Sequence, residues 1–315
     1  MSEQTTKETP ESPARRALLR AGAVLAAGAA FHPPAPASAG VSRRAIADYL
    51  REDATGLAAL VRGRKVSAAE VLEIAIARTE ALDPAINAVV LRHFDLAREA
   101  VKHLPAEAPL AGVPWLLKDL GAPLAGTVTT GGSRFFRDAV AARDSTLVSR
   151  YRAAGLLIFG KTASPELGRT ATTESTLWGI TRNPWNTDYS SGGSSGGCSA
   201  AVAAGILPAA HATDGGGSIR IPAALCGLFG MKPTRLRTPT GPGRGEGWGG
   251  LSIAHAITRS VRDSALILDL SQGPEPGAAY WPPPPAAPYV QEIDREPGRL
   301  RIGVVRASPV GSTID

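Results

Sequence analysis

The chain has 315 residues, 43% of them hydrophobic, which suits one large domain or two ordinary ones with a sizeable core. The formal net charge is +6, but basic and acidic residues alternate along the chain and no basic run is interleaved with aromatic residues, which argues against nucleic-acid binding. The two cysteines and five histidines show no metal-ligand spacing, so we expect neither a metal site nor a cofactor.

Residues 1–39 are expected to be an export signal rather than part of the fold. Adjacent Arg15 and Arg16 precede an apolar run over 21–31, and small residues at 37–39 suit cleavage by signal peptidase. This order is typical of a twin-arginine signal, so we predict a periplasmic or secreted protein. The alternatives are a short amphipathic helix or a membrane anchor, but the run is too short and too rich in Ala and Gly to span hydrocarbon.

The cysteines, Cys198 and Cys226, stand in unrelated sequence contexts. Twin-arginine export carries folded proteins, so both thiols should be buried before they meet an oxidising compartment. We therefore expect two free core thiols, with a disulfide as the alternative.

Residues 40–105 have the pattern of a helical region. Ser67 and Glu70 form an S-x-x-E capping box ahead of a helical run that we expect to end before Pro84. Two further elements are expected downstream in this region: a strand at 86–90 and a helix at 93–104.

The segment 106–271 changes to alternating helix and apolar strand, which indicates the α/β class with functional loops at strand ends. Short apolar runs at 112–118 and 156–160 are the strand candidates. The helix between them is expected to begin at Asp144 or Ser145 and to close at Gly155.

Lys118 ends the first of these apolar runs, GVPWLLK. A lysine in this position either extends its amine to the surface or has it held in a dry site. In a dry site desolvation lowers the pKa from about 10.4 toward neutrality, and the amine can act as a base if hydroxyl groups surround it.

Two loops rich in glycine and serine could supply those hydroxyls. The stretch SSGGSSGGCS at 190–199 resembles a flexible linker by composition alone. Further along, Ser218 follows three residues without Cβ, whose N–H groups can point into one concavity, as an oxyanion hole beside a nucleophile requires. Neither loop matches a phosphate-binding fingerprint.

Three motifs together resemble the amidase signature family: GVPWLLKD from residue 112, GGSSGG from residue 192 and TDGGGSIRIPAALCGLFGMKPT from residue 213. The resemblance implies a mixed twisted sheet flanked by helices, and hydrolysis of a small-molecule amide through an acyl-serine intermediate. Later segments resemble the branch that includes 6-aminohexanoate cyclic-dimer hydrolase. This family uses a Ser-Ser-Lys triad.

The resemblance implies a role for each residue of this chain that matches a functional position of the family motifs. Ser218 matches the acylated nucleophile, Ser194 the bridging serine that passes a proton, and Lys118 the general base. The oxyanion-hole segment corresponds to three glycines, Gly215, Gly216 and Gly217, together with the N–H of Ser218.

Other polar residues near these motifs receive structural roles. Asp214 and Arg220 flank the glycine loop and are expected to pair and hold its shape. Ser195 and Ser199 are expected to be loop and helix-cap hydroxyls. The histidines His211 and His255 are expected to be hydrogen-bonded or surface residues rather than bases.

The C-terminal part departs from the family. Four prolines at 282–285 lie in an expected connector over 272–299, after which LRIGVV at 300–305 predicts a new strand. Family members typically continue well beyond this point, so residues 300–315 are expected to begin a truncated C-terminal portion. The fold would then be incomplete at that end.

Three functions therefore stay open at this stage. The first is an active amidase, the second a catalytically silent remnant or binding module, and the third an ester-selective hydrolase with the same triad. We expect no nucleic-acid partner and no stable membrane anchor, and a homo-oligomer is left open.

Overall fold

The computed structural model describes residues 41–242, 245–275, 277–278, 281–304 and 311. The predicted export signal at 1–39 lies outside this part of the chain. Among the described residues, no helix is both long enough and apolar enough to cross a bilayer.

Three helices form the N-terminal region, α2 (Arg43–Arg51), α3 (Ala54–Arg62) and α4 (Ala68–Ile86). The predicted capping box at the start of α4 is confirmed, because the Ser67 hydroxyl accepts from Glu70 N and the Glu70 carboxylate accepts from Ser67 N. The predicted end before Pro84 is wrong. Pro84 lies in the last turn, where it removes a single backbone N–H donor and only two helical residues follow its ring, and Asn87 closes the helix in the left-handed conformation.

Two three-stranded sheets form the centre of the molecule. The first has the order β1-β3-β2, with β3 (Leu157–Thr162) antiparallel to β1 (Val89–Arg92) and parallel to β2 (Pro114–Lys118). The second is antiparallel, with the order β8-β10-β9 for β8 (Ala209–Asp214), β10 (Ile253–Thr258) and β9 (Phe229–Gly230). Because β2 packs beside β8, Lys118 at the end of one sheet meets the other.

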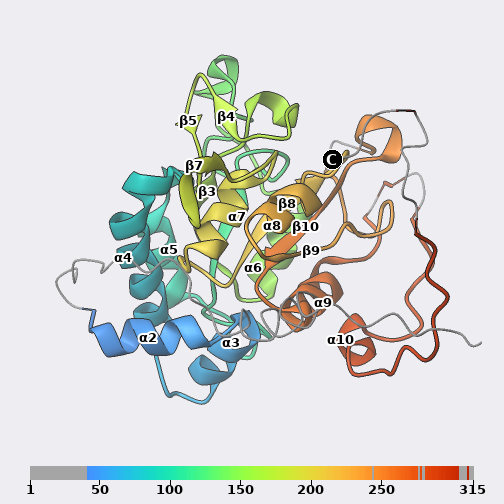
Figure 1. Ribbon diagram of the computed structural model, residues 1–315. Coiled ribbons are helices and arrows are strands. Elements are labelled where there is room, and N and C mark those ends of the chain that lie inside the picture. Colours follow the sequence, from blue (N-terminus) through green and yellow to red (C-terminus); the bar gives the residue numbers. More distant parts are fainter. Residues whose placement is uncertain (1–40, 243–244, 276, 279–280, 305–310, 312–315) are drawn as a thin grey trace, which may run out of the picture.

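Helices surround these sheets, with the N-terminal helices at one side and β8, β10 and α8 near the middle of the view (Figure 1). The remaining helices are α5 (Phe94–Lys102), α6 (Thr146–Ala153), α7 (Gly196–Ala203), α8 (Arg220–Leu225), α9 (Val261–Ser271) and α10 (Tyr289–Glu292). Short single turns are η1 (Arg134–Phe136), η2 (Glu166–Gly168) and η3 (Trp248–Gly250). Two small hairpins pair β4 (Glu174–Ser175) with β5 (Gly179–Ile180), and β6 (Arg182–Asn183) with β7 (Asn186–Ser190).

The helix α7 lies inside the molecule and consists of small residues. Its residues 196–202 are all buried, and it contacts β2, β3, β8 and β10. Small side chains let the helix backbone approach strands of both sheets closely. The N-terminus of α7 is thereby brought to the place where β2 and β8 end.

The strand predicted at 300–305 is not present in its described part. Residues 300–304 carry no strand assignment, and Leu300, Ile302 and Val304 are exposed. A strand needs a partner for its backbone N–H and C=O groups, and none of the described strands pairs with this segment.

Candidate active site

Lys118 has its amine in the interior. It is the last residue of β2 and is fully buried. Its Nζ donates to Ser194 Oγ at 2.8 Å, to Ser195 Oγ at 2.9 Å and to Thr213 Oγ1 at 3.0 Å. Three hydroxyl oxygens thus occupy the three positions around the amine, and the surface-exposed alternative for this lysine is excluded.

Burial lowers the pKa of Lys118 to about 7. The thiol of Cys198 and the carboxylate of Asp214 act in the opposite direction, but the loss of hydration is the larger effect. A substantial fraction of the amine is therefore neutral near pH 7, as a general base requires.

The loop before α7 is a close-approach segment rather than a linker. Residues 191–195 are buried. A Cβ built on Gly193 would lie 2.7 Å from the Thr172 carbonyl carbon, one on Gly196 would lie 2.5 Å from Ser191 Oγ, and one on Gly197 would lie 2.5 Å from Ala163 N. Glycine is required here because backbone atoms at Gly193 and Gly197, and the side chains of Thr173 and Ser191 at Gly196, occupy the space that a side chain would need. The peptide bond between Gly193 and Ser194 is cis.

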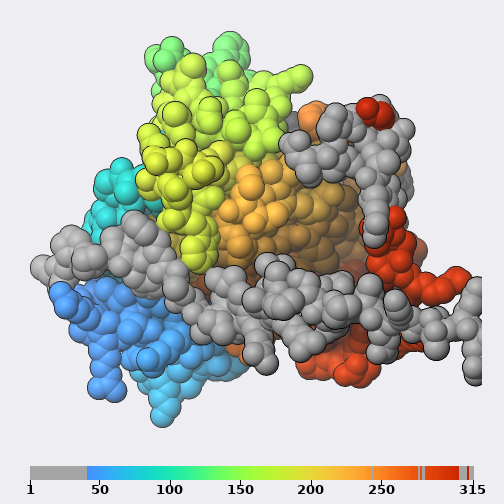
Figure 2. Space-filling model, in the orientation of Figure 1, coloured from blue at the N-terminus to red at the C-terminus, as the bar shows by residue number. Residues whose placement is uncertain are grey.

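Ser218 lies between β8 and α8 and is partly buried. Figure 2 shows that the orange surface in the middle of this face lies recessed between yellow-green loops above it and the red C-terminal segment. The segment from β8 to α8 crosses the same central region in Figure 1. Among the described residues, the Ser218 hydroxyl makes no hydrogen bond, so the structure joins Ser194 to Lys118 but does not join Ser218 to either of them.

Asp214 organises the turn that carries Ser218. Its buried carboxylate accepts from Gly217 N at 2.8 Å, from Ile219 N at 3.1 Å and from Arg220 Nε at 2.9 Å. Burial by itself raises the pKa of this carboxyl, but the Arg220 guanidinium and the two backbone N–H groups together hold it below its usual range. The ion pair expected between Asp214 and Arg220 is present.

The glycine loop differs in one respect from the predicted oxyanion hole. The N–H of Gly217 donates to Asp214, so Gly217 contributes its left-handed backbone (φ +125°) rather than a free donor. The N–H groups of Gly215, Gly216 and Ser218 make no hydrogen bond to any described residue. These three are the donors available to an anionic oxygen.

Sequence reasoning missed three residues around Lys118. Ser195, expected to be a loop or cap hydroxyl, accepts from Lys118 and donates to Thr213 O at 3.2 Å instead of capping α7. Thr213 Oγ1 is the third hydroxyl oxygen that accepts from Lys118 Nζ, and His211 Nδ1 accepts from Lys118 N at 3.1 Å. The sequence could have indicated His211 and Thr213, because side chains alternate between the two faces of a strand and residues 211 and 213 of β8 therefore lie on the same face.

The two buried histidines have structural partners. Burial lowers the pKa of His211 to about 3, so the ring is neutral and accepts from the Lys118 backbone. His255 Nε2 lies 2.7 Å from Ser264 Oγ. These contacts agree with hydrogen-bonded roles rather than with a histidine base.

A second buried lysine, Lys161, binds a loop near the site. Lys161 Nζ donates to Val128 O and Thr129 Oγ1, both at 2.6 Å, and burial lowers its pKa to about 8. Asp119, the residue that follows Lys118 in the chain, is also buried and accepts from Thr130 N at 2.8 Å. Two buried charges thus hold the loop at 128–130, which sequence reasoning did not assign.

That loop in turn supports the turn η2. Leu167 N donates to Gly131 O at 2.7 Å, and Ser133 Oγ donates to Glu166 Oε1 at 2.6 Å. A Cβ built on Gly168 would lie 3.2 Å from Ser194 Oγ. The buried charges therefore position a turn that touches the serine bound to Lys118.

Both cysteines are free and buried, as expected. The Cys198 thiol donates to His211 O at 2.8 Å and contacts Thr162 Oγ1 at 2.9 Å, and burial raises its pKa to about 11. A thiol with this pKa is unreactive at neutral pH. Within the described residues, no three His, Cys, Asp or Glu side chains come together as a metal site.

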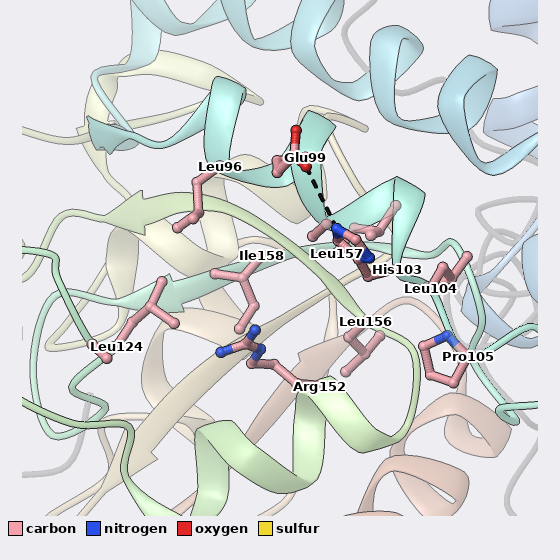
Figure 3. A pocket seen from close by; sticks show the side chains of 12 residues that line it. Leu96, Glu99, His103, Leu104, Pro105, Leu124, Arg152, Leu156, Leu157 and Ile158 are labelled. Atoms are coloured by element: carbon pink, nitrogen blue, oxygen red, sulfur yellow. Dashed lines mark ion pairs between the residues drawn. The ribbon is translucent and has the colours of Figure 1, made fainter.

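A separate cavity of about 220 Å³ lies between α5, α6 and β3 (Figure 3). Its floor is apolar and includes Leu124, Leu157 and Ile158, and at its rim Glu99 Oε1 lies 3.5 Å from His103 Nε2. Lys118, Ser194 and Ser218 do not line it, so it is separate from the candidate site.

Replacing Gly193 tests the close approach of the loop. Gly193→Ala places a methyl group against the Thr172 backbone and should lower the free energy of unfolding by about 1–3 kcal/mol, while displacing Ser194 from Lys118. Urea denaturation of both forms measures the change. Gly245→Ala, where the added Cβ meets nothing within 4 Å, is the control, and its stability should change by less than about 0.5 kcal/mol. Equal stability of the two variants would contradict the assignment.

Two curated proteins show the relationship of the chain at the sequence level. The profile of the family described as Amidase matches residues 70–314. A 6-aminohexanoate-cyclic-dimer hydrolase from Paenarthrobacter ureafaciens is 45% identical over 266 residues, covering 83% of this chain and 54% of the relative. The protein of that name from Pseudomonas sp. (strain NK87) has the same identity and coverage. The chain thus spans about half the length of these relatives.

Solved structures agree with the sequence match. The 6-aminohexanoate cyclic dimer hydrolase complexed with substrate aligns with a TM-score of 0.80 and 43% identity, covering 84% of this chain and 55% of that one. A bacterial aryl acylamidase of the amidase signature enzymes aligns with a TM-score of 0.68 and 40% identity, covering 72% and 49%. These alignments confirm the mixed α/β fold expected from the motifs. The chain belongs to the amidase signature family.

Proposed function

We propose that this protein hydrolyses a carboxylic amide through an acyl-serine intermediate, with Ser218 as nucleophile, Ser194 as proton relay and Lys118 as general base. The observation that carries the proposal is the buried amine of Lys118, 2.8 Å from Ser194 Oγ and with its pKa lowered to about 7. Burying a lysine amine removes its hydration and disfavours its charged form. The neutral amine, surrounded by hydroxyl groups, can then accept a proton.

Acylation begins when Ser218 Oγ attacks the amide carbon. Its proton passes to Ser194 while the proton of Ser194 passes to Lys118, because a free alkoxide is too basic to form first. The carbonyl oxygen becomes an oxyanion, and the free N–H groups of Gly215, Gly216 and Ser218 are the donors that stabilise it. Asp214 keeps these donors in place by holding the turn.

The reverse transfer expels the leaving group. Protonated Lys118 returns its proton through Ser194 to the amine as the carbon–nitrogen bond breaks, since an amide anion is a poor leaving group. Water then attacks the acyl-Ser218 ester, with neutral Lys118 again accepting the proton through Ser194. The carboxylic acid leaves and Ser218 recovers its hydroxyl.

The substrate class we favour is a small neutral amide, such as a linear or cyclic amide of an ω-amino acid. The similarity to two relatives named 6-aminohexanoate-cyclic-dimer hydrolase supports this choice. Comparing kcat/KM for a matched amide and ester of 6-aminohexanoic acid tests it against the ester-selective alternative, which requires turnover of the ester alone.

A fluorophosphonate tests the nucleophile directly. Peptide mapping should place the label on Ser218, because phosphonylation requires an activated hydroxyl. Ser218→Ala should abolish labelling, and Lys118→Ala should slow it by about 10²–10⁴-fold through loss of the base. Ser149→Ala on α6, at an exposed residue whose hydroxyl bonds to Ser145 O within its own helix, is the control and should label normally. An unlabelled native protein would instead favour the catalytically silent alternative.

The pH dependence of labelling tests the state of Lys118. Since its pKa is lowered to about 7, the neutral base predominates above that value and the protonated form below it. The labelling rate should therefore rise with pH through about 7 and then level off. A rate that climbs until about pH 10, the ordinary range of lysine, would show that the amine is not held in a dry site.

For the cellular location, we propose export by the twin-arginine route to the periplasm or the medium. The support is the order of Arg15, Arg16, the apolar run at 21–31 and the small residues at 37–39.

Conservative substitution of the two signal arginines tests the route. Arg15→Lys with Arg16→Lys should leave the uncleaved chain in the cytoplasm, because the export machinery reads the arginine pair itself. Fractionation and intact mass measure the outcome. The other adjacent pair supplies the control, since Arg43→Lys with Arg44→Lys lies at the start of α2 and should export normally. Equal export of both double variants would contradict the proposal.

A further inference from the structure

Trp248 is held in an exposed position by its own turn. The side chain is 61% exposed, and the residue has φ +55°, a conformation that favours glycine. The turn is closed by Gly250 N donating to Gly247 O at 3.0 Å and by Leu251 N donating to Trp248 O at 3.2 Å. A large apolar side chain displayed outward at an unfavourable backbone angle calls for a functional explanation.

The sheet register brings this turn to the glycine loop. Ile253, the first residue of β10, pairs with Asp214, the last residue of β8. Because these strands are antiparallel, the chain that enters β10 and the chain that leaves β8 meet at the same end of the sheet. The turn of Trp248 and the loop that leads to Ser218 are therefore neighbours.

Direct contact follows from this arrangement. A Cβ built on Gly215 would lie 2.7 Å from Trp248 Cε3 and 3.0 Å from Cζ3, so the indole edge rests on the Gly215 backbone. Gly215 is the first of the three free N–H donors next to Ser218. In the described part of the chain, the indole N–H makes no hydrogen bond.

We infer that the indole of Trp248 is an apolar wall of the acyl-binding site and sets the preference for substrates with an extended methylene chain beside the scissile carbonyl. The inference rests on the proposed function, since it requires Ser218 to be the acylated residue. An oxyanion bound at Gly215 brings the group attached to the carbonyl carbon near the exposed part of the indole. A methylene chain lying there removes apolar surface of both partners from water.

The test compares two alkylphosphonofluoridates that share an ethoxy group and differ in the alkyl group on phosphorus, methyl in one and octyl in the other. The alkyl group takes the place of the acyl chain when Ser218 is phosphonylated. The native protein should react faster with the octyl reagent. Trp248→Ala should lower the octyl-to-methyl rate ratio about tenfold, the factor expected when roughly two methylene groups lose their apolar contact.

Two further variants show whether a changed rate ratio is caused by loss of the Trp248 indole. Trp248→Gly removes the indole while suiting the left-handed turn, so it should reproduce the lowered ratio even if Trp248→Ala disturbs folding. Trp281→Ala is the matched control, because Trp281 is 55% exposed and lines a different cleft with Pro239 and Pro274. This control should keep the native ratio.

The outcomes separate the two proposals. If the glycine variant is labelled on Ser218 but keeps the native octyl-to-methyl ratio, the inference about Trp248 is wrong and the proposed function stands. If the methyl reagent fails to label the native protein on Ser218, the proposed function is wrong and the inference falls with it.

Discussion

The arrangement of the site depends on keeping the amine of Lys118 out of water. An amine loses hydration when it is buried, and the protein replaces that hydration with three hydroxyl oxygens. These come from two separate segments, the loop before α7 and the end of β8. The strand β2, the helix α7 and the strand β8 must therefore meet at one point. The lowered pKa of the amine is a consequence of this meeting.

Close backbone approach makes the meeting possible. The loop at 190–197 and the start of α7 run so close to neighbouring segments that side chains at Gly193 and Gly197 would collide with backbone atoms, and one at Gly196 with the side chains of Thr173 and Ser191. Glycine here serves conformation and space rather than flexibility. The same principle shapes the second loop, where Asp214 binds backbone N–H groups and leaves other donors free beside Ser218.

Local chemistry and recognisable motifs were enough to predict part of this structure. The capping box at Ser67 needs only residues three apart, and it forms as predicted. The pairing of Asp214 with Arg220 also spans a single turn. The motifs identified Lys118 and Ser194 as partners 76 residues apart, a separation at which composition and periodicity carry no information. The α/β class followed from alternating helix and apolar strand.

Tertiary structure decided the features that depend on which segments become neighbours. Ser195 and Thr213 accept from the Lys118 amine only because α7 packs beside β8. Trp248 contacts Gly215 only because the register of β10 pairs Ile253 with Asp214. The predicted strand at 300–305 is absent over its described residues, 300–304, for the same reason, since an apolar segment needs a partner strand before it forms a strand. The local sequence pattern limits which secondary structures and contacts a segment can form, and the segments packed against it decide which of these it adopts.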